Sequence, residues 1–460
     1  MRAAVRKVRS LLSTAVLLLL IGASAEAQTA HLFSPFAFAA QPLTAGQQQA
    51  VAKLRGLTST ASLDLVTLDV AALGVGAIID LPDGSSVLAT RQVSPGQEAA
   101  DSSWIGAWDD GRGRAVFFVK DGAITGTIRN GADRYAVTPL GDGIHVLRKI
   151  KNVPIPDSDD AVPLPGSDSG WLQRQGTVVT PVDPVQVNIL VAYTSAAKVE
   201  YVGDIDALIA SQVLAANDVF ANSNANVVLN LVGTMETGYD ENVADSSPTD
   251  WLRVLSALQA GSDPSMAAVH TRRDELAADL VMLLNDKAVV AVCGIAYFGF
   301  DDNGPMPESG FATATVASAA LCLVGAPTFV HEIGHNFGAA HDRKNAASPP
   351  YQSYGYGYQY PFGPTPFRTV MAYACTAPDP PCPENDLFSN PDIAYAGVPD
   401  GVAGSADVAR LIRLTGPYVA AYRGGGTPAP APPAAALDPA TILALLLLAA
   451  AGAAVRVRRS

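Results

Sequence analysis

Three of the six histidines of this chain fall within eleven residues, at positions 331, 335 and 341. Side chains four residues apart on a helix project from one face, so His331 and His335 can bind the same divalent metal ion through ring nitrogens. Gly338 can adopt the positive φ that ends a helix, which would return His341 as a third ligand. Three neutral imidazoles leave one coordination position open, as in catalytic zinc sites. The spacing therefore predicts a catalytic zinc centre.

Glu332 directly follows the first of these histidines. Its carboxylate can accept a proton from water at the open position and pass it to a leaving amine, while the zinc polarises the scissile carbonyl and acidifies that water. The residues thus indicate hydrolysis. Two alternatives stay open. A zinc-fold adhesin or toxin-like binding module would be expected to lack the glutamate. A zinc amidase acting on cell wall would share the three ligands but would have no need of an edge strand for peptides.

The pattern His-Glu-x-x-His-x-x-Gly-x-x-His resembles the signature of the metzincin zinc endopeptidases. Asp342, directly after the third histidine, is similar to the reprolysin or adamalysin branch. The resemblance, which points to a bacterial secreted type, implies cleavage of proteins or peptides with Zn²⁺ as cofactor. It also implies that Met371 forms the Met-turn beneath the metal. Tyr373 departs from the adamalysin turn and is similar to astacins and serralysins, where this tyrosine approaches the transition state; an ordinary half-buried aromatic is the alternative.

Length and composition limit the domain count and the partners. The chain has 460 residues, of which 49% are hydrophobic and 16% charged, and this length suggests about three domains. Its net charge of −13 argues against nucleic acid as a partner, because phosphate binding requires a basic patch. Most basic clustering lies at the two ends. We expect a monomer that binds protein or peptide substrates.

Both ends of the chain carry apolar segments flanked by basic residues. Residues 1–27 have the layout of a secretory signal peptide, which predicts a secreted or cell-surface protein. A Gly/Pro/Ala linker is predicted at 424–437, and residues 438–460 form an apolar segment that ends in arginines. This tail resembles the C-terminal sorting signals of exported bacterial proteins, which hold the protein at the membrane until processed. A permanent transmembrane anchor is the alternative.

The four cysteines all follow residue 290, and in an exported protein an even number favours disulfides. Cys375 and Cys382 would close the loop after the Met-turn, and Cys293 would then pair with Cys322. This is the preferred one of three possible pairings.

Residues 28–170 are predicted to form a small β-rich domain ending in a Pro/Asp/Ser-rich linker. Apolar alternation at 116–119 and 124–128 indicates strands, and Asp-Gly or Asn-Gly pairs at 121–122, 130–131 and 142–143 indicate hairpin turns. The stretch 104–147 resembles the prodomain of bacterial reprolysin-like proteases, although a carbohydrate or adhesion module remains the alternative. No cysteine precedes Cys293, so latency would need a carboxylate or steric cover instead of a thiol on the zinc.

Residues 185–423 are predicted to form the catalytic domain, with an α/β fold. Strands at 187–193, 227–232 and 279–284 alternate with a helix at 205–222, and the zinc helix is expected from Pro327 to Phe337. The metzincin resemblance implies a mixed, mostly parallel sheet with an antiparallel edge strand. An extended substrate would pair with an edge strand made of Gly294, Ile295, Ala296 and Tyr297. Structural Ca²⁺ could bind to the side-chain oxygens of Asp301, Asp302, Asn303 and Glu308. An ordinary strand and a solvated acidic loop are the respective alternatives.

Overall fold

The computed structural model describes residues 30–39, 41–92, 102–151, 161–164, 184–241, 250–286, 293–316, 322 and 327–423. The predicted signal peptide, the 424–437 linker and the C-terminal segment 438–460 lie outside the described residues. Among the residues that are described, no helix is both long enough and apolar enough to cross a membrane.

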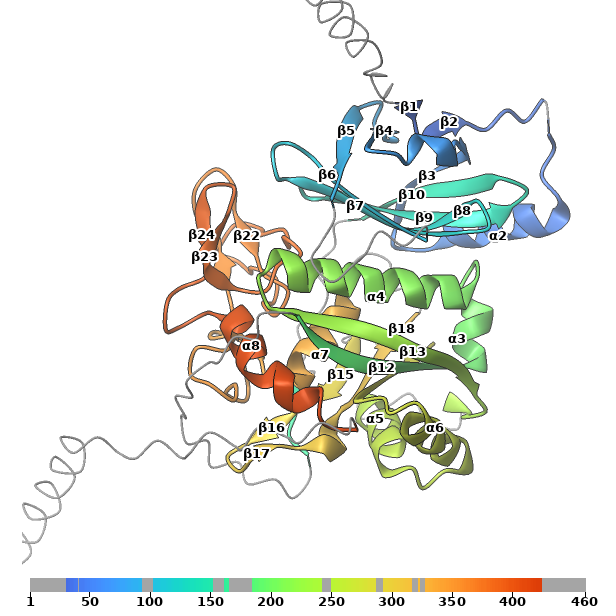
Figure 1. Ribbon diagram of the computed structural model, residues 1–460. Helices are drawn as coiled ribbons and strands as arrows, with labels where there is room; N and C mark the ends of the chain where they lie inside the picture. Colours follow the sequence, from blue (N-terminus) through green and yellow to red (C-terminus); the bar gives the residue numbers. More distant parts are fainter. Residues whose placement is uncertain are drawn as a thin grey trace, which may run out of the picture.

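The N-terminal unit is a strongly bent sheet of ten strands, upper in Figure 1, with the helix α2 packed on it. The strand order is β1-β4-β5-β6-β7-β8-β9-β10-β3-β2, and all pairs are antiparallel except β1 with β4. The elements are β1 Ala30–His31, β2 Phe33–Pro35, α2 Ala45–Gly56, β3 Thr60–Leu68, η1 Val70–Ala72, β4 Gly76–Asp80, β5 Ser86–Arg91, β6 Ser103–Ala107, β7 Gly113–Lys120, β8 Ala123–Asn130, β9 Asp133–Gly141 and β10 Ile144–Ile150. The β-rich prediction is confirmed.

Turn chemistry explains the consecutive hairpins of this sheet. Asp121 and Gly122 connect β7 to β8 with φ of 51° and 75°, and Asp142 and Gly143 connect β9 to β10 with φ of 52° and 75°. Two-residue turns with both φ positive match the twist of the strands that they join, which is why Asp-Gly pairs favour them.

The second unit is built on a six-stranded sheet in the order β11-β15-β18-β14-β12-β13. All neighbours are parallel except β15 and β18. The strands are β11 Ala161–Val162, β12 Val185–Thr194, β13 Val227–Thr237, β14 Leu280–Asn285, β15 Gly294–Tyr297 and β18 Phe311–Thr315. The mostly parallel α/β sheet is as predicted. One difference is that β11, from the expected linker, is the outermost strand beside β15.

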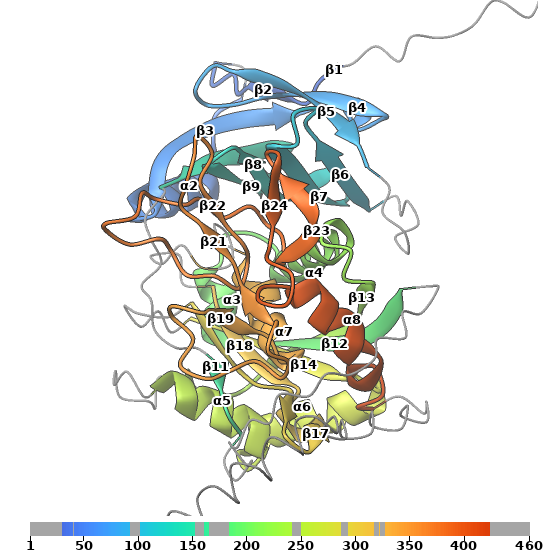
Figure 2. The same cartoon turned by 90° about the vertical axis from the view of Figure 1, so that its left-hand side faces the viewer.

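Helices cover both faces of this sheet. On one face Val187, Ile189 and Val191 pack against α4, α7 and α8, and on the other Leu190 and Ala192 pack against α5 and α6. The helices are α3 Ser195–Glu200, α4 Ile205–Asn222, α5 Asp250–Ala260, α6 Pro264–Glu275, α7 Thr328–Asn336 and α8 Val408–Val419. Figure 2 shows α5 and α6 below the sheet. Alternate side chains of β12 thus serve two cores, because successive residues of a strand point to opposite faces.

The chain after α7 forms short two-stranded sheets that pack beside the N-terminal unit (Figures 1 and 2). Three short elements precede α7: β16 Phe300–Asp301, β17 Gly304–Pro305 and η3 Pro307–Ser309. The strands after α7 are β19 Ala340–Asp342, β20 Tyr356–Gly357, β21 Gln359–Tyr360, β22 Phe367–Arg368, β23 Asn390–Tyr395 and β24 Val398–Asp400. This irregular part carries the third histidine and the Met-turn.

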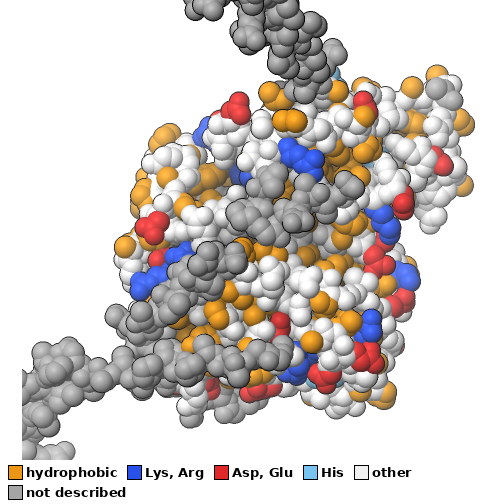
Figure 3. Space-filling view, viewed as in Figure 1, with side chains coloured by type: hydrophobic (Ala, Val, Ile, Leu, Met, Phe, Trp, Pro, Cys, Tyr) orange, Lys and Arg blue, Asp and Glu red, His pale blue; other side chains and the backbone are white. Residues whose placement is uncertain are grey.

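Ion pairs join the two units, and the cation of each comes from the N-terminal unit. Arg114 pairs through two nitrogens with Asp218 of α4, while Arg129 and Arg134 bind the two carboxylate oxygens of Asp386 at 2.7 and 2.6 Å. Further pairs are Lys120–Asp204 at 2.6 Å and Lys53–Glu200 at 3.0 Å. Figure 3 shows basic and acidic side chains interleaved along the right-hand side, where α2 approaches α3. Charge complementarity therefore orients the N-terminal unit on the second unit.

Candidate metal and catalytic site

Helix α7 and the turn after it bring the three histidines together. The helix ends at Asn336, and Gly338 has a φ of +87°, as its place in the sequence predicted. Its amide donates to the carbonyl of His335 at 2.8 Å, and the reversed chain enters β19 with His341 at its centre. A residue with a Cβ would be strained at that φ. The glycine thus determines where the third imidazole lies.

The ring nitrogens of the three histidines converge on one point. Nε2 of His331 lies 3.2 Å from Nε2 of His335 and 3.3 Å from Nε2 of His341. Nitrogens that bind one zinc ion at about 2.0–2.1 Å in tetrahedral geometry lie roughly 3.3–3.4 Å apart. The spacing therefore fits zinc. Within the described chain, His331, His335 and His341 form the one group of three or more His, Cys, Asp or Glu side chains whose ligand atoms lie close enough together to bind one metal ion.

Hydrogen bonds at the far side of two rings fix which nitrogen faces the metal position. Nδ1 of His331 donates to the carbonyl of Val370 at 2.7 Å, and Nδ1 of His335 donates to the carbonyl of Ala339 at 2.8 Å. A carbonyl oxygen only accepts, so Nδ1 carries the proton and Nε2 of each neutral ring presents a lone pair. Lone pairs that face each other at this distance repel unless a cation lies between them. The donor set therefore fits a resident metal ion.

Glu332 belongs to the zinc helix, and its side chain lies against β15. Its side chain is buried, with 1% of its surface exposed. A Cβ built on Gly294 would lie 2.4 Å from Oε1 of Glu332, so the carboxylate packs directly on the backbone of that strand. The structure therefore places the predicted general base beside the predicted substrate strand.

Met371 lies under the zinc helix, in the turn that the sequence analysis assigned as the Met-turn. The turn is closed by a hydrogen bond from the amide of Ala372 to the carbonyl of Thr369 at 2.9 Å, and Met371 is fully buried. A Cβ on Gly334 would lie 2.5 Å from the sulfur, so this glycine lets the helix rest on the methionine. Val370, one residue earlier, provides the carbonyl that orients His331. The turn therefore supports both the helix and a ligand.

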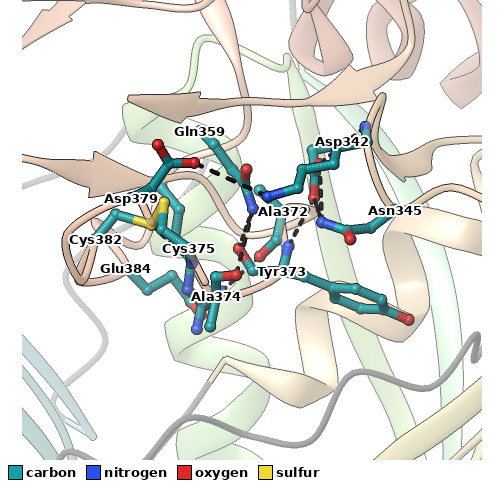
Figure 4. Close-up of a disulfide and its surroundings, with 12 residues drawn as sticks. Asp342, Asn345, Gln359, Ala372, Tyr373, Ala374, Cys375, Asp379, Cys382 and Glu384 are labelled. Carbon is teal, nitrogen blue, oxygen red and sulfur yellow. Dashed lines mark hydrogen bonds and ion pairs between the residues drawn. A yellow bond between two sulfur atoms is a disulfide. The ribbon is translucent and has the colours of Figure 1, made fainter. Parts of the chain in front are cut away.

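Tyr373 packs on the third imidazole. Its ring centroid is 4.1 Å from that of His341 at an interplanar angle of 31°. Its amide donates to Oδ2 of Asp342 at 3.1 Å, and Gln359 donates to its carbonyl at 2.8 Å (Figure 4). Hydrogen bonds at both its amide and its carbonyl thus hold Tyr373, the predicted transition-state donor, beside His341.

Asp342 is a residue whose role the sequence reading missed, because it served only as a family marker. Besides the amide of Tyr373, its carboxylate accepts bonds from the amide of Lys344 at 3.1 Å and from the side chain of Asn345 at 3.0 and 2.9 Å (Figure 4). It therefore ties the strand of the third ligand to the Met-turn. A polar residue immediately beside a ligand was the available signal.

Asn336 is a second residue that sequence reasoning did not single out. Its side-chain amide donates to the carbonyls of Tyr297, Ser309 and Phe311 at 2.9, 3.2 and 3.2 Å. Because these carbonyls belong to β15, η3 and β18, one side chain holds the end of the zinc helix on the sheet. A side-chain amide on the same helix face as the apolar Phe329 and Ile333 was the signal.

The two disulfides have the predicted pairing. Cys293 bonds to Cys322, and Cys375 bonds to Cys382. The first anchors the residue before Gly294, and the second closes the loop after the Met-turn (Figure 4). Structural disulfides indicate an oxidising, extracytoplasmic compartment.

The acidic loop offered for Ca²⁺ forms a hairpin turn between β16 and β17. Oδ1 of Asp301 accepts from the amides of Asn303 and Gly304 at 2.7 and 3.2 Å. Its oxygens thus stabilise the turn. Asp302 and Glu308 do not join it in a group with metal-binding geometry among the described residues.

Buried charges lie near the site where the N-terminal unit contacts the chain after the Met-turn. Burial raises the pKa of Glu384, although Arg368 and Arg134 oppose the rise. Burial also disfavours ionisation of Asp386, but Arg134 and Arg129 outweigh that effect and lower its pKa. Asp386 therefore depends on two arginines of the N-terminal unit for charge compensation, whereas Glu384 is compensated first by Arg368 of its own unit, at 2.7 Å.

Comparison with known proteins agrees with this geometry. The model of the reprolysin-like metallopeptidases of family M12B matches residues 184–403. A peptidyl-Asp metalloendopeptidase of Stenotrophomonas maltophilia strain R551-3 is 33% identical over 433 residues, which cover 88% of this chain and 97% of the relative. Proteins of the same name from S. maltophilia strain K279a and Xanthomonas campestris are 32% and 31% identical, covering 88% and 83% of this chain and 97% and 90% of theirs.

Proposed function

This chain belongs to the reprolysin-like M12B metallopeptidases and is a zinc metalloendopeptidase, and from that membership we propose that it cleaves exported or extracellular proteins at peptide bonds next to aspartate. The observation that carries the peptidase activity is the convergence of three Nε2 atoms beside the buried carboxylate of Glu332. The aspartate preference is taken from the names of relatives aligned over nearly their whole length.

The site residues divide the chemistry among them. Zinc, when bound by the three imidazoles, supplies a Lewis acid that polarises the scissile carbonyl and makes water a stronger acid. Glu332 accepts the proton of the attacking water and delivers it to the leaving amine. The hydroxyl of Tyr373 donates a hydrogen bond to the oxygen that gains negative charge. Hydrogen bonds from the imidazole Nδ1 atoms to Val370 and Ala339 keep two ligands oriented throughout.

The N-terminal unit acts as a prodomain in this proposal. It precedes the catalytic unit and docks on it through the arginine–aspartate pairs described above. Residues 1–27 direct export, and residues 438–460 hold the chain at the membrane until processing. The enzyme works as a monomer on extended segments of protein substrates, which pair with β15. These assignments rest on the sequence pattern and on the contacts between the units.

A digest of casein by the processed enzyme, with mass spectrometry of the products, tests this function. We expect new termini to be adjacent to aspartate, and cleavage to stop with a zinc chelator and to return with zinc. Chelator-sensitive cleavage without a preference for aspartate would reject the specificity alone. Absence of any cleavage, with hydrolysis of cell-wall amides instead, would reject the endopeptidase proposal.

A further inference from the structure

The outer edge of β15 is occupied by the chain's own residues. Ala161 and Val162 pair with Ala296 and Tyr297 in parallel register, and the amide of Phe298 donates to the carbonyl of Val162 at 3.0 Å. Ala161 and Val162 belong to the described stretch 161–164, here called the edge segment; residues 152–160 and 165–183 on either side of it are not described. The edge segment follows the N-terminal unit and precedes the catalytic unit in the chain.

The edge beneath this segment runs along the catalytic helix. At one end of β15, Gly294 packs on Glu332. At the other, the ring of Phe298 lies 5.7 Å from that of His335, and the carbonyl of Tyr297 accepts a bond from Asn336. A chain paired to β15 therefore lies parallel to the line of catalytic groups.

Side chains also anchor the edge segment. Ala161 has 5% of its surface exposed and packs with Phe298 and Ala340, directly before the third zinc ligand. Val162 and Leu164 pack against the apolar cluster on the other face of the sheet. Because adjacent side chains of the segment enter two different clusters, its register on β15 is fixed.

We propose that the edge segment is an internal inhibitor that competes with protein substrates for the outer edge of β15. The backbone donors and acceptors along this sheet edge can bind either the edge segment or an extended substrate peptide, but not both at once. The ion pairs of the N-terminal unit keep the segment nearby at high effective concentration. Cutting the chain within residues 165–183, followed by release of the N-terminal unit, removes that advantage and opens the edge. This inference rests on the proposed function, because it assumes that substrates pair with β15.

The experiment uses the full chain with Glu332→Gln, loaded with zinc, so that it cannot process itself. The probe is a fluorescein-labelled peptide that the processed wild-type enzyme cleaves, and its binding is followed by anisotropy. Ala161→Glu places a charge in the buried contact with Phe298 and Ala340, and should tighten probe binding by at least about tenfold. Lys151→Glu adds the same carboxylate at an exposed position before the segment and should leave binding unchanged.

A second measurement uses uncut full chains with Glu332 intact. Ala161→Glu should raise the initial rate of probe cleavage by a similar factor over the uncut wild type, with intact mass confirming that neither is processed. A misfolded variant cannot show such a gain. Equal binding and equal rates for Ala161→Glu and wild type would overturn the inhibitor role, as would an uncut wild type that is as active as the processed form. If the processed wild type cleaves no peptide at all, the proposed function itself fails.

Discussion

Gly294 and Glu332 are in direct contact, with no space between the backbone of the proposed substrate strand β15 and the carboxylate of the proposed general base. A Cβ at position 294 would lie 2.4 Å from Oε1 and 2.7 Å from Cδ of Glu332. The strand that is proposed to bind the substrate therefore also determines where the base lies.

Gly294→Ala should displace the Glu332 carboxylate and leave the zinc ligands in place. We expect kcat to fall by about 10²-fold, as for displacements near 1 Å in other active sites, with zinc content unchanged. Steady-state kinetics with metal analysis measures both. Gly238→Ala is the matched control, because its added Cβ would meet Ser265 Oγ at an ordinary 3.4 Å. Wild-type kcat in Gly294→Ala would show that the contact does not position the base.

Asp342→Ala should weaken zinc binding without removing a ligand. The carboxylate holds the amide of Tyr373 and the side chain of Asn345, so its loss frees the strand that carries His341. Loss of such a supporting contact typically costs about 10–100-fold in metal affinity. Competition with a chromophoric chelator measures the affinity. Asp392→Ala, at an exposed position, should match the wild type, and equal affinities for both variants would exclude this supporting role.

Tyr373→Phe keeps the ring on His341 and removes only the hydroxyl. If the hydroxyl stabilises the transition state, kcat should fall by about 10²-fold while KM and zinc affinity stay near wild type. Kinetics on a fluorogenic peptide separates the two constants. Unchanged kcat would reduce Tyr373 to a packing residue.

Docking of the N-terminal unit should depend on pH through Asp386. Burial opposes its ionisation, but Arg134 and Arg129 prevail, so its pKa lies below the ordinary value of 3.8. A lowered carboxyl pKa contributes stability that is complete above the ordinary value and is lost as pH falls through the lowered one. After the connecting stretch is cut, the two units should co-elute at neutral pH and separate in acid below the ordinary value.

Asp386→Asn should weaken this docking at neutral pH. It removes the charge that two arginines share, worth about 2 kcal/mol, or roughly thirtyfold in affinity. Asp392→Asn, at an exposed site, provides the control for the loss of one carboxylate. Co-elution of the Asp386→Asn units with wild-type affinity would show that these ion pairs do not hold the assembly together.

Local sequence rules predicted much of the fold and of the metal centre. Helical spacing and the positive φ of Gly338 set the positions of the histidines within one short segment, so no distant contact was needed. The helix at 205–222 matches α4 because its apolar residues recur at helical period.

The features that the sequence did not reveal depend on contacts between distant segments. The pairing of Ala161 with Ala296 joins residues 135 positions apart, and nothing in a two-residue strand within a proline-rich stretch indicates its partner. The same holds for Arg134 and Asp386, whose charges have many possible partners until both units are folded. Packing of Gly294 on Glu332 likewise depends on the position of β15 relative to α7.

The most direct test of the account is zinc content and turnover measured together in the processed enzyme and in Glu332→Gln. The account predicts about one zinc per chain in both proteins, with turnover lower in the variant by about 10²–10⁴-fold, the usual contribution of a general base. Full turnover by Glu332→Gln, or a processed enzyme that cleaves protein without zinc, would contradict it.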